Sequence, residues 1–506
     1  MKPLARSSIL VAGFFGLDKL TGLVRQLLVA RQFGVGPQLD AFNVAHNLPD
    51  LLFALISGGA LSLAFIPVLT QTLGREGREA LWQLFSRVAN LAFLATGLLS
   101  LGLAVFALPL VGWKYGIAPG FDPQQQQLVA ELMRLDLIST LIFSLSGLVL
   151  SALQSLQHFL LPAMAPVFYN LGMIIGVLIL APARSLQIGS WALPALGLGI
   201  RGLVYGGVLG AGLHLAIQLP GLWRYRFRYA FSLGLRDPLV AQVARLMGPR
   251  ILSLGAVQLI STVTGNLASY LGAGAVSALA YGWLIMQLPE TMIGTAVGTV
   301  LLPSLAEQWV RGNEAGFNRT LGRGVRLILL LTSAAGVSLS FLLPPLVSPL
   351  FGFDPRGTHL VVLAAQMYLV GLLGQSLLEV AARAFYARQD ARTPLLASLV
   401  NLGIFLGVAP WLARASGPAG IALANSLTFS FEALLLLGLL WRSGRRFDFL
   451  LSLGKAGLMA AALAGVMFVW QRTGLALLPF TLGGSALCAA ISLPLLWPEL
   501  RGWARG

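Results

Sequence analysis

Apolar runs of about 20 residues recur from one end of the chain to the other, and each is long enough to cross a bilayer core roughly 30 Å thick. Only 10% of the 506 residues are charged, whereas soluble domains contain about 25%. A β-barrel would show short segments of alternating polarity instead. The sequence therefore predicts an all-α polytopic membrane protein.

Glycines, prolines and charge clusters divide the chain into fourteen candidate transmembrane helices. The first apolar run leads directly into Asp18 and Lys19 without a small-residue cleavage site, which favours a helix over a cleaved signal. Alternate connections and both termini are rich in arginine, so these parts are expected to be cytoplasmic. The predicted spans are residues 8–33, 38–72, 80–112, 126–155, 159–181, 194–221, 240–271, 275–309, 318–350, 358–388, 393–413, 418–441, 452–471 and 474–497.

The chain repeats itself. The motif NLGMIIGV begins at Asn170 and NLGIFLGV begins at Asn401, each preceded by a polar turn and a proline, Pro162 or Pro394. Each is followed by a helix ending in Leu-Trp-Arg, and FIPVLTQ earlier in the chain matches LLPSLAE. The repeat places helices 1–6 over helices 7–12 in the same orientation, as in parallel transporter repeats. It predicts an N-terminal lobe over 1–222, a cytoplasmic linker over 223–239, a C-terminal lobe over 240–442, and two extra helices with the C-terminus over 443–506.

The first predicted helix carries Asp18, Lys19 and Arg25 on one face. A charge at the bilayer centre costs from about 3 to over 10 kcal/mol, so this face must meet protein or water. The second helix adds Asp40 and Asn47. We therefore expect Lys19, Arg25 and Asp40 to line a polar cavity with Asp18 nearby, and the basic wall suggests an anionic ligand.

Further polar residues lie in later helices. Gln287 and Glu290 flank a proline in helix 8, and Glu379 precedes Arg383 in helix 10. A single Asn or Gln in such a helix is commonly satisfied by an interhelical hydrogen bond. Glu379 and Glu290 are candidates for binding a proton or sodium ion.

Several functional classes are disfavoured by what the sequence contains. Cys488 is the single cysteine, which excludes an internal disulfide, and the four histidines lack metal-ligand spacing. The net charge of +16 follows from topology rather than from nucleic-acid binding. No nucleotide-binding motif or catalytic set can be placed, so we expect neither an enzyme nor a cofactor. The energy for any transport must then come from an ion gradient, the membrane potential or the substrate's own gradient.

Four stretches carry a family resemblance: TGLVRQLLVARQFGVGPQLDAFNVAHNLPDLL, LPAMAPVFYNLGM, LLPSLAEQW and FYARQDARTP. They resemble the MurJ/MviN family, the lipid II flippases of the MOP exporter superfamily. The resemblance implies two six-helix lobes round a central cavity, with helices 13 and 14 forming a groove for a polyprenyl tail. It also implies a monomer in the bacterial cytoplasmic membrane, surrounded by lipid and working with other cell-wall synthesis proteins. Its cargo would be an undecaprenyl-linked peptidoglycan precursor, moved from the inner to the outer leaflet by alternating access.

The family's cavity residues carry over only in part. Lys19 stands where the family has an arginine three residues before a glycine, while Arg25 and Asp40 match directly. Phe53 and Leu284 stand where the family has arginines, and its glutamate is replaced by Gln287. Three alternatives therefore remain: an exporter of another polyprenyl-linked glycolipid, a multidrug or small-molecule antiporter, or a non-transporting scaffold. The two extra helices favour a lipid-linked substrate over a drug.

Overall fold

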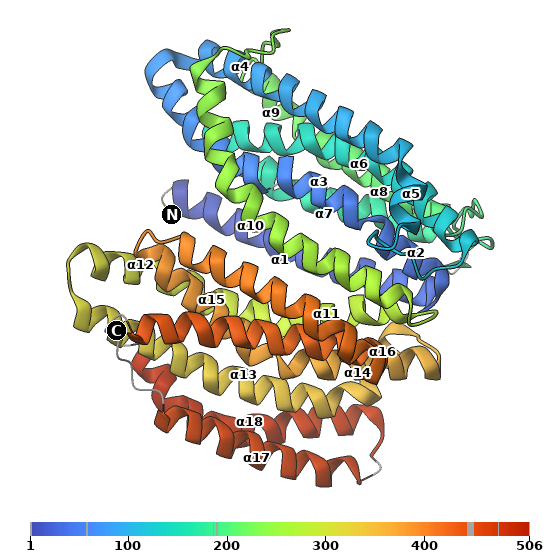
Figure 1. The fold of residues 1–506 in the computed structure, drawn as a ribbon, viewed down its shortest axis with the longest axis vertical. Coiled ribbons are helices and arrows are strands. Elements are labelled where there is room, and N and C mark those ends of the chain that lie inside the picture. The colour runs from blue at the N-terminus through green and yellow to red at the C-terminus, as the bar shows by residue number, and fades with distance from the viewer. Residues whose placement is uncertain are drawn as a thin grey trace. The chain divides into compact units, whose positions relative to one another are not determined.

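The computed structural model describes residues 3–56, 59–185, 187–188, 191–442, 450–473 and 475–504. Almost all of these residues are helical, and the described part includes one short hairpin, β1 (Gln187–Ile188) and β2 (Trp191–Ala192). The chain forms two compact units, Met1–Tyr270 and Leu271–Gly506. Figure 1 draws the first from blue to green and the second from green to red.

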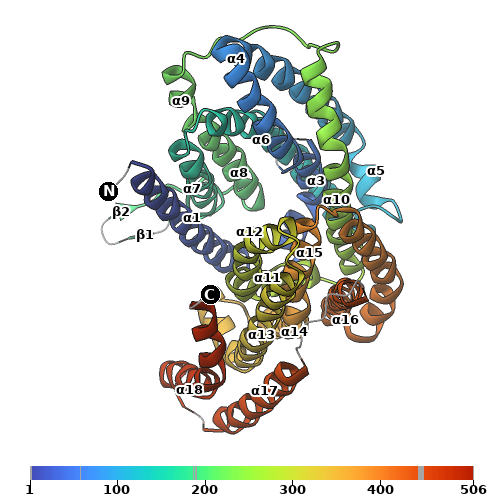
Figure 2. The ribbon, with the colours of Figure 1, turned by 90° about the vertical axis from the view of Figure 1, so that its left-hand side faces the viewer.

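Unit 1 is built round α6, which packs on α4 and α8, while α7 packs on α8 and α1. Figure 2 shows α1, α4, α6, α7 and α8 in a second view of this unit. The helices of this unit are α1 (Pro3–Phe33), α2 (Pro37–Ala45), α3 (Asn47–Ile56), α4 (Gly59–Val105), α5 (Ala107–Gly112), α6 (Pro123–Ser155), α7 (Leu160–Ile175), the π-helix η1 (Gly176–Leu180), α8 (Ile200–Ala216), α9 (Leu219–Arg224) and α10 (Pro238–Ser269).

Unit 2 is organised round α13, which contacts α12, α14, α15, α17 and α18. The two helices that the sequence leaves outside the repeat are α17 and α18, and both pack on α13. Cys488 is buried in α18. The helices are α11 (Ala275–Glu290), the π-helix η2 (Thr291–Thr295), α12 (Ala296–Val310), α13 (Glu314–Phe351), α14 (Pro355–Val370), α15 (Leu372–Ala387), α16 (Arg392–Arg442), α17 (Leu450–Gln471) and α18 (Leu477–Ala504).

The structure confirms an all-α polytopic membrane fold. Within the described ranges, nine helices are long and apolar enough to cross a membrane, or up to ten if the bent pair α14 and α15 counts as one span. Two long helices contain non-helical residues, Gly77 in α4 and Ser416 and Gly417 in α16, where the chain turns. Because α16 covers two of the predicted spans, the number of helices and the number of spans differ. The count of fourteen spans stays a prediction.

A further motif is repeated just before two of the helices. Gly-Phe-Asp-Pro occurs at residues 120–123 and again at 352–355. In each copy the aspartate caps the next helix: Asp122 accepts a hydrogen bond from the Gln125 amide at the start of α6, and Asp354 accepts one from the Gly357 amide at the start of α14, both at 2.9 Å. Proline follows at the first helical position, where its missing N–H is not needed. The two motifs therefore start their helices in the same way.

The two polar turns before the matched prolines also share a backbone conformation. Gln157 and Gln389 both have φ of 59°, in the left-handed region. In each turn the next residue's amide bonds back to a carbonyl five residues earlier: His158 to Leu153 at 2.8 Å, and Asp390 to Phe385 at 3.0 Å. Segments that match in sequence thus fold alike locally.

Helix α10 lies at the predicted start of the C-terminal lobe. In the structure it packs on α3 and α4 and forms part of unit 1. The lobe boundaries at residues 222 and 240 follow from the sequence repeat, and they stay a prediction.

Candidate functional site

Polar side chains of α1 are fixed by a single residue of α7. The Asn170 amide nitrogen donates to the backbone oxygen of Asp18 at 3.2 Å, to its carboxylate at 3.0 Å and to the Thr21 hydroxyl at 3.1 Å. Gly22 faces the same amide, because a Cβ at this position would lie 3.6 Å from the Asn170 nitrogen. This contact sets how α1 is rotated against α7.

The two cations of α1 lie in different surroundings. Lys19 Nζ is 3.8 Å from a carboxylate oxygen of Asp18, and the lysine side chain is 80% exposed. Arg25 is half-buried, with its guanidinium carbon 5.6 Å from the centre of the Tyr169 ring on α7. Such a cation over an aromatic face is attracted by the negative face of the ring. The structure therefore brings Asp18 and Lys19 together and places Arg25 against α7.

The predicted residues of the second helix lie deeper. Asp40 in α2 is fully buried, with 0% exposure. Asn47 begins α3, and its backbone oxygen accepts from Gln258 of α10 at 3.4 Å. A Cβ on Gly265 of α10 would come within 2.8 Å of the Asn47 amide, so glycine permits this close packing. A polar cavity lined by Lys19, Arg25 and Asp40 stays a prediction.

A second polar group in unit 1 consists of residues that are not among the site residues predicted from the sequence. His46 lies between α2 and α3, and its Nε2 is 3.7 Å from Asp136 of α6. The charge of Asp50, four residues later, also acts on His46, as does that of Arg25. The spacing of His46 and Asp50 is the i, i+4 signal of one helix face, whereas Asp136 has no local signal.

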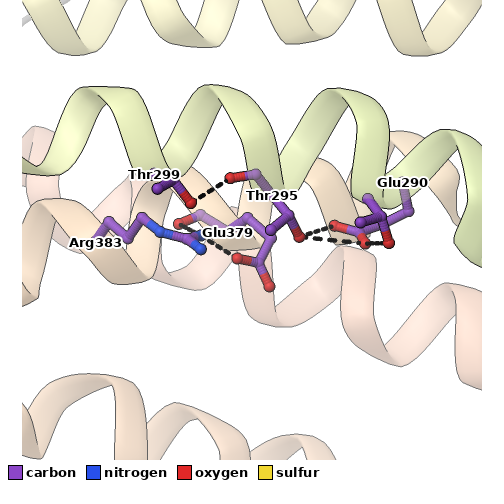
Figure 3. A network of polar contacts seen from close by, with 6 residues as sticks. Glu290, Thr295, Thr299, Glu379 and Arg383 are labelled. Atoms are coloured by element: carbon purple, nitrogen blue, oxygen red, sulfur yellow. Dashed lines mark hydrogen bonds and ion pairs between the residues drawn. The ribbon is translucent and has the colours of Figure 1, made fainter. Parts of the chain in front are cut away.

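In unit 2 the predicted acidic pair is close together, as Figure 3 shows. Glu290 at the end of α11 accepts from the Thr295 hydroxyl at 3.3 Å, and the charge of Glu379 on α15 acts on Glu290. Glu379 itself forms an ion pair with Arg383 one turn later. Gln287, by contrast, is exposed.

Two glycines make room for this group. A Cβ at Gly294 would lie 2.8 Å from a Glu290 carboxylate oxygen, and one at Gly298 would lie 2.6 Å from the Arg383 guanidinium. Side chains on that face of η2 and α12 would therefore displace the charged groups. The two acids are among the residues predicted from the sequence, whereas these two glycines are not.

A further buried acid lies in α16. Glu432 accepts from the Asn401 amide at 2.6 Å, and the charges of Glu432, Glu379 and Arg383 all act on Tyr386. Asn401 is the first residue of the second copy of the repeated motif, and this position is the sequence signal that singles it out. Within the described ranges, no three His, Cys, Asp or Glu side chains are placed to hold a metal ion.

The chain is similar to known proteins over almost its whole length. The sequence profile of the family described as "Lipid II flippase MurJ" matches residues 29–482. The lipid II flippase MurJ of Burkholderia cenocepacia is 32% identical over 404 residues, which cover 78% of this chain and 75% of that protein. A probable lipid II flippase MurJ of Rhizobium meliloti is 30% identical over 466 residues, covering 89% and 84%.

Solved structures show the same fold. A structure titled "Lipid II flippase MurJ, inward closed conformation" superposes with a TM-score of 0.78 at 21% identity, covering 98% of this chain and 99% of that one. An inward-facing multidrug resistance MATE family transporter of the MOP superfamily gives a TM-score of 0.68 at 16% identity, covering 85% and 95%. At these identities the likeness concerns the fold alone.

Proposed function

The chain belongs to the lipid II flippase MurJ family, and from this premise we propose that it moves the lipid-linked peptidoglycan precursor lipid II from the inner to the outer leaflet of the cytoplasmic membrane. The observation that carries the proposal is the family match, which runs through both units from residue 29 to residue 482. The activity is transport rather than an enzymatic reaction.

Lys19 and Arg25 are proposed to hold the anionic headgroup of the cargo. Lys19 is largely exposed and its ion pair with Asp18 is long at 3.8 Å, so its ammonium keeps donors for another partner. The Asp18 carboxylate is already engaged by Asn170. Charge-assisted hydrogen bonds to phosphate would offset the cost of keeping cations on an apolar helix. Alternating access would then present these residues to one leaflet and afterwards to the other.

Helices α17 and α18 are proposed to contact the polyprenyl tail. They pack on α13 and on each other and lie outside the repeat. Large apolar side chains on both are exposed, including Leu458, Val469, Leu478 and Leu482. An apolar surface of this kind suits a hydrocarbon chain.

A second cargo, another polyprenyl-linked glycolipid, is favoured by Phe53 and Leu284. These residues stand where the family resemblance implies arginines. Phe53 packs its ring on Phe143 at a centroid distance of 5.5 Å, so this position belongs to an aromatic contact rather than to a cation cluster. A headgroup with fewer negative charges would need fewer cations.

Glu290 and Glu379 are proposed as residues that bind a coupling cation. Two carboxylates that act on each other gain from sharing a proton or a monovalent cation, and Arg383 compensates only part of their charge. The two threonines beside Glu290 supply further oxygens. Asn47 in unit 1 and Gln287 in unit 2 are each proposed as further residues that contact the cargo.

The protein is further proposed to be a monomer with both termini in the cytoplasm. The arginine-rich segment between α9 and α10 would then also be cytoplasmic. Arg226 is exposed in this segment, so an Arg226→Cys variant suits labelling with a membrane-impermeant thiol reagent. Labelling only after the cells are opened is expected, and labelling of intact cells would overturn this orientation.

The decisive experiment is complementation of a bacterial strain depleted of its own lipid II flippase. We expect the wild-type chain to restore growth and to prevent accumulation of lipid II in the inner leaflet. A matched control is the Lys19→Ala/Arg25→Ala double variant at equal membrane abundance, which should fail to restore growth. Failure of the wild-type chain, once inserted and folded, would contradict lipid II as cargo and favour the second glycolipid.

A further inference from the structure

At the break between α2 and α3, His46 faces the Asp136 carboxylate and lies one helical turn before Asp50, and the proposed transport mechanism uses none of these three residues. The His46 side chain is 22% exposed and that of Asp136 is 10% exposed. Their closest charged atoms, Nε2 and Oδ1, are 3.7 Å apart. Asp50 lies one helical turn after His46, and its charge acts on both partners.

The hydrogen bonds decide which ring nitrogen of His46 can change its protonation. Nδ1 is 2.7 Å from the backbone oxygen of Phe42. A carbonyl oxygen only accepts, so Nδ1 must carry a hydrogen. Nε2 is therefore the nitrogen that gains or loses a proton, and it is the one that faces Asp136. Without a proton between them, a ring lone pair and a carboxylate would face each other in a poorly hydrated place.

The surrounding charges balance only when that proton is present. The charged groups acting on His46 are Asp136 from α6, Asp50 from α3 and Arg25 from α1. Helices α4, α8 and α10 also pack on α2 or α3, and none of their described residues is among these charges. With His46 protonated, two cations offset two carboxylates. Loss of the proton leaves an uncompensated negative charge, which is costly at Asp136 because its side chain is only 10% exposed, whereas Asp50 is exposed to solvent.

Another histidine of the same unit shows the contrast. His214 of α8 contacts the Ser146 hydroxyl at 2.6 Å and lies 3.4 Å from the Gln218 amide nitrogen. Both of these partners are neutral. A half-buried histidine is therefore not sufficient for the arrangement at His46, on which the charges of two carboxylates and an arginine act.

We propose that His46, Asp136 and Asp50 form a proton-binding site in unit 1 and that its loading is coupled to cargo binding at Arg25. The coupling part of this inference rests on the proposed transport function. An anionic headgroup on Arg25 would neutralise the one nearby cation that opposes a proton on His46. Anion and proton then bind more tightly together than apart, and by linkage each strengthens the other equally.

The proton site itself is tested without any transport. The chain has four histidines, so ¹⁵N-histidine NMR of the purified full-length protein gives four pairs of ring-nitrogen signals, assigned by single His→Gln variants. In Asp136→Asn the titration of His46 should move to lower pH by about one unit or more, because an opposite charge within a few ångströms is lost. Asp50→Asn, which keeps the ion pair, should move it the same way by less.

His214→Gln is the matched control, and it should leave the His46 titration in place. If Asp136→Asn and Asp50→Asn also leave it in place, the proton site is refuted. Inorganic pyrophosphate should move the His46 titration to higher pH in the wild type. The same titration in Arg25→Ala should not respond to pyrophosphate, and an unchanged response there would refute the coupling.

Transport then tests the consequence. In proteoliposomes with the membrane potential clamped at zero, a proton gradient should change the rate of lipid II flipping several-fold in the wild type. His46→Gln keeps a donor for Phe42 but cannot titrate, so its rate should not respond to the gradient. A retained response would overturn the coupling. Absence of flipping by the wild type would contradict the proposed function, and the NMR titrations alone would decide the proton site.

Discussion

One buried amide determines which face of α1 carries exposed charge. Asn170 binds the Asp18 carboxylate and the Thr21 hydroxyl, and its side chain is almost completely buried. Residues on a helix are separated by about 100° per position, so Lys19 projects away from this contact. Its 80% exposure follows directly from the position of Asn170. The charged residues of α1 therefore divide into Asp18, which contacts α7, and Lys19, which is exposed and is proposed to hold the ligand.

Lys19→Ala and Arg25→Ala should each impair transport strongly while leaving the fold intact. A hydrogen bond to a charged group contributes about 1.5–3 kcal/mol, so each loss should slow transport by roughly ten- to a hundred-fold. Complementation and the flipping rate measure activity, and the melting temperature monitors folding. Lys114→Ala removes a lysine that lies over the Tyr115 ring in another segment, and it should behave as wild type. Full activity of both α1 variants at normal expression would place the site elsewhere.

Helix α8 packs through glycines on α7 and on η1, which continues α7. A Cβ at Gly206 would lie 2.6 Å from Gly176 Cα, and a Cβ at Gly176 would lie 2.8 Å from Gly206 Cα. Close approach of backbones through small residues is how transmembrane helices associate in lipid. The α7–η1 segment and α8 are therefore closely packed, and α1 contacts α7 through Asn170.

Gly206→Ala should consequently destabilise unit 1. The added methyl group must push the helices apart, which costs about 1–3 kcal/mol in a packed interior. Gly212→Ala, on the same helix with nothing within 4 Å of its Cβ, should be neutral or stabilising by up to about 1 kcal/mol. Thermal unfolding of purified variants in one detergent measures the difference. Equal melting temperatures for the two variants would contradict the close packing.

The start of α16 should lose stability at low pH. Burial raises the pKa of the Asp390 carboxyl, but hydrogen bonds from Thr393 and the Arg392 amide outweigh burial and hold the pKa below its usual value. The charged carboxylate therefore stabilises the fold above its unfolded pKa of about 3.9, and this contribution disappears as the pH falls through the folded value.

Asp390→Ala should cost about 1 kcal/mol at pH 7, as for other helix caps, and less near pH 3. Asp390→Asn keeps a capping oxygen that does not titrate, so its advantage over Asp390→Ala should not depend on pH. Melting temperatures at the two pH values provide the comparison. A gap between wild type and Asp390→Ala that is the same at both would refute this account.

Local features could be predicted from the sequence, and tertiary ones could not. The Asp18–Lys19 pair, the helices and the repeated turns depend on residues close together in the chain. The contact between His46 and Asp136 depends on how α6 packs on α2, ninety residues away, and hydrophobic periodicity does not encode it. The adjacency of Glu290 and Glu379 likewise arises from packing between α11 and α15. The Gly-Phe-Asp-Pro repeat can also be read from the sequence, because it lies directly before α6 in one copy and before α14 in the other.

For the molecule as a whole, we expect transport to depend on the membrane potential. Moving one elementary charge through 100 mV is worth about 2.3 kcal/mol. A potential that is negative inside draws an empty, cationic binding site towards the cytoplasm and favours outward release of an anionic headgroup. The potential then favours both steps, the return of the empty site towards the cytoplasm and the outward release of the headgroup. A proton on His46 would change the net charge of the returning site.

Dissipating the potential with valinomycin and potassium, at a constant pH gradient, should therefore slow export in cells. Collapse of a sodium gradient alone serves as the control and should have a smaller effect. Unchanged export without the potential, combined with loss of export when a proton or sodium gradient is removed, would reject this model. That result would instead favour coupling through Glu290 and Glu379 of unit 2.

Two glutamines adopt the left-handed backbone conformation at their turns. A residue with a Cβ pays about 1 kcal/mol or more in that conformation, and glycine would not. Gln157 and Gln389 are both exposed at their turns, and both copies of the repeat have glutamine at this position. These two turns therefore carry a conformational cost that glycine at either position would relieve.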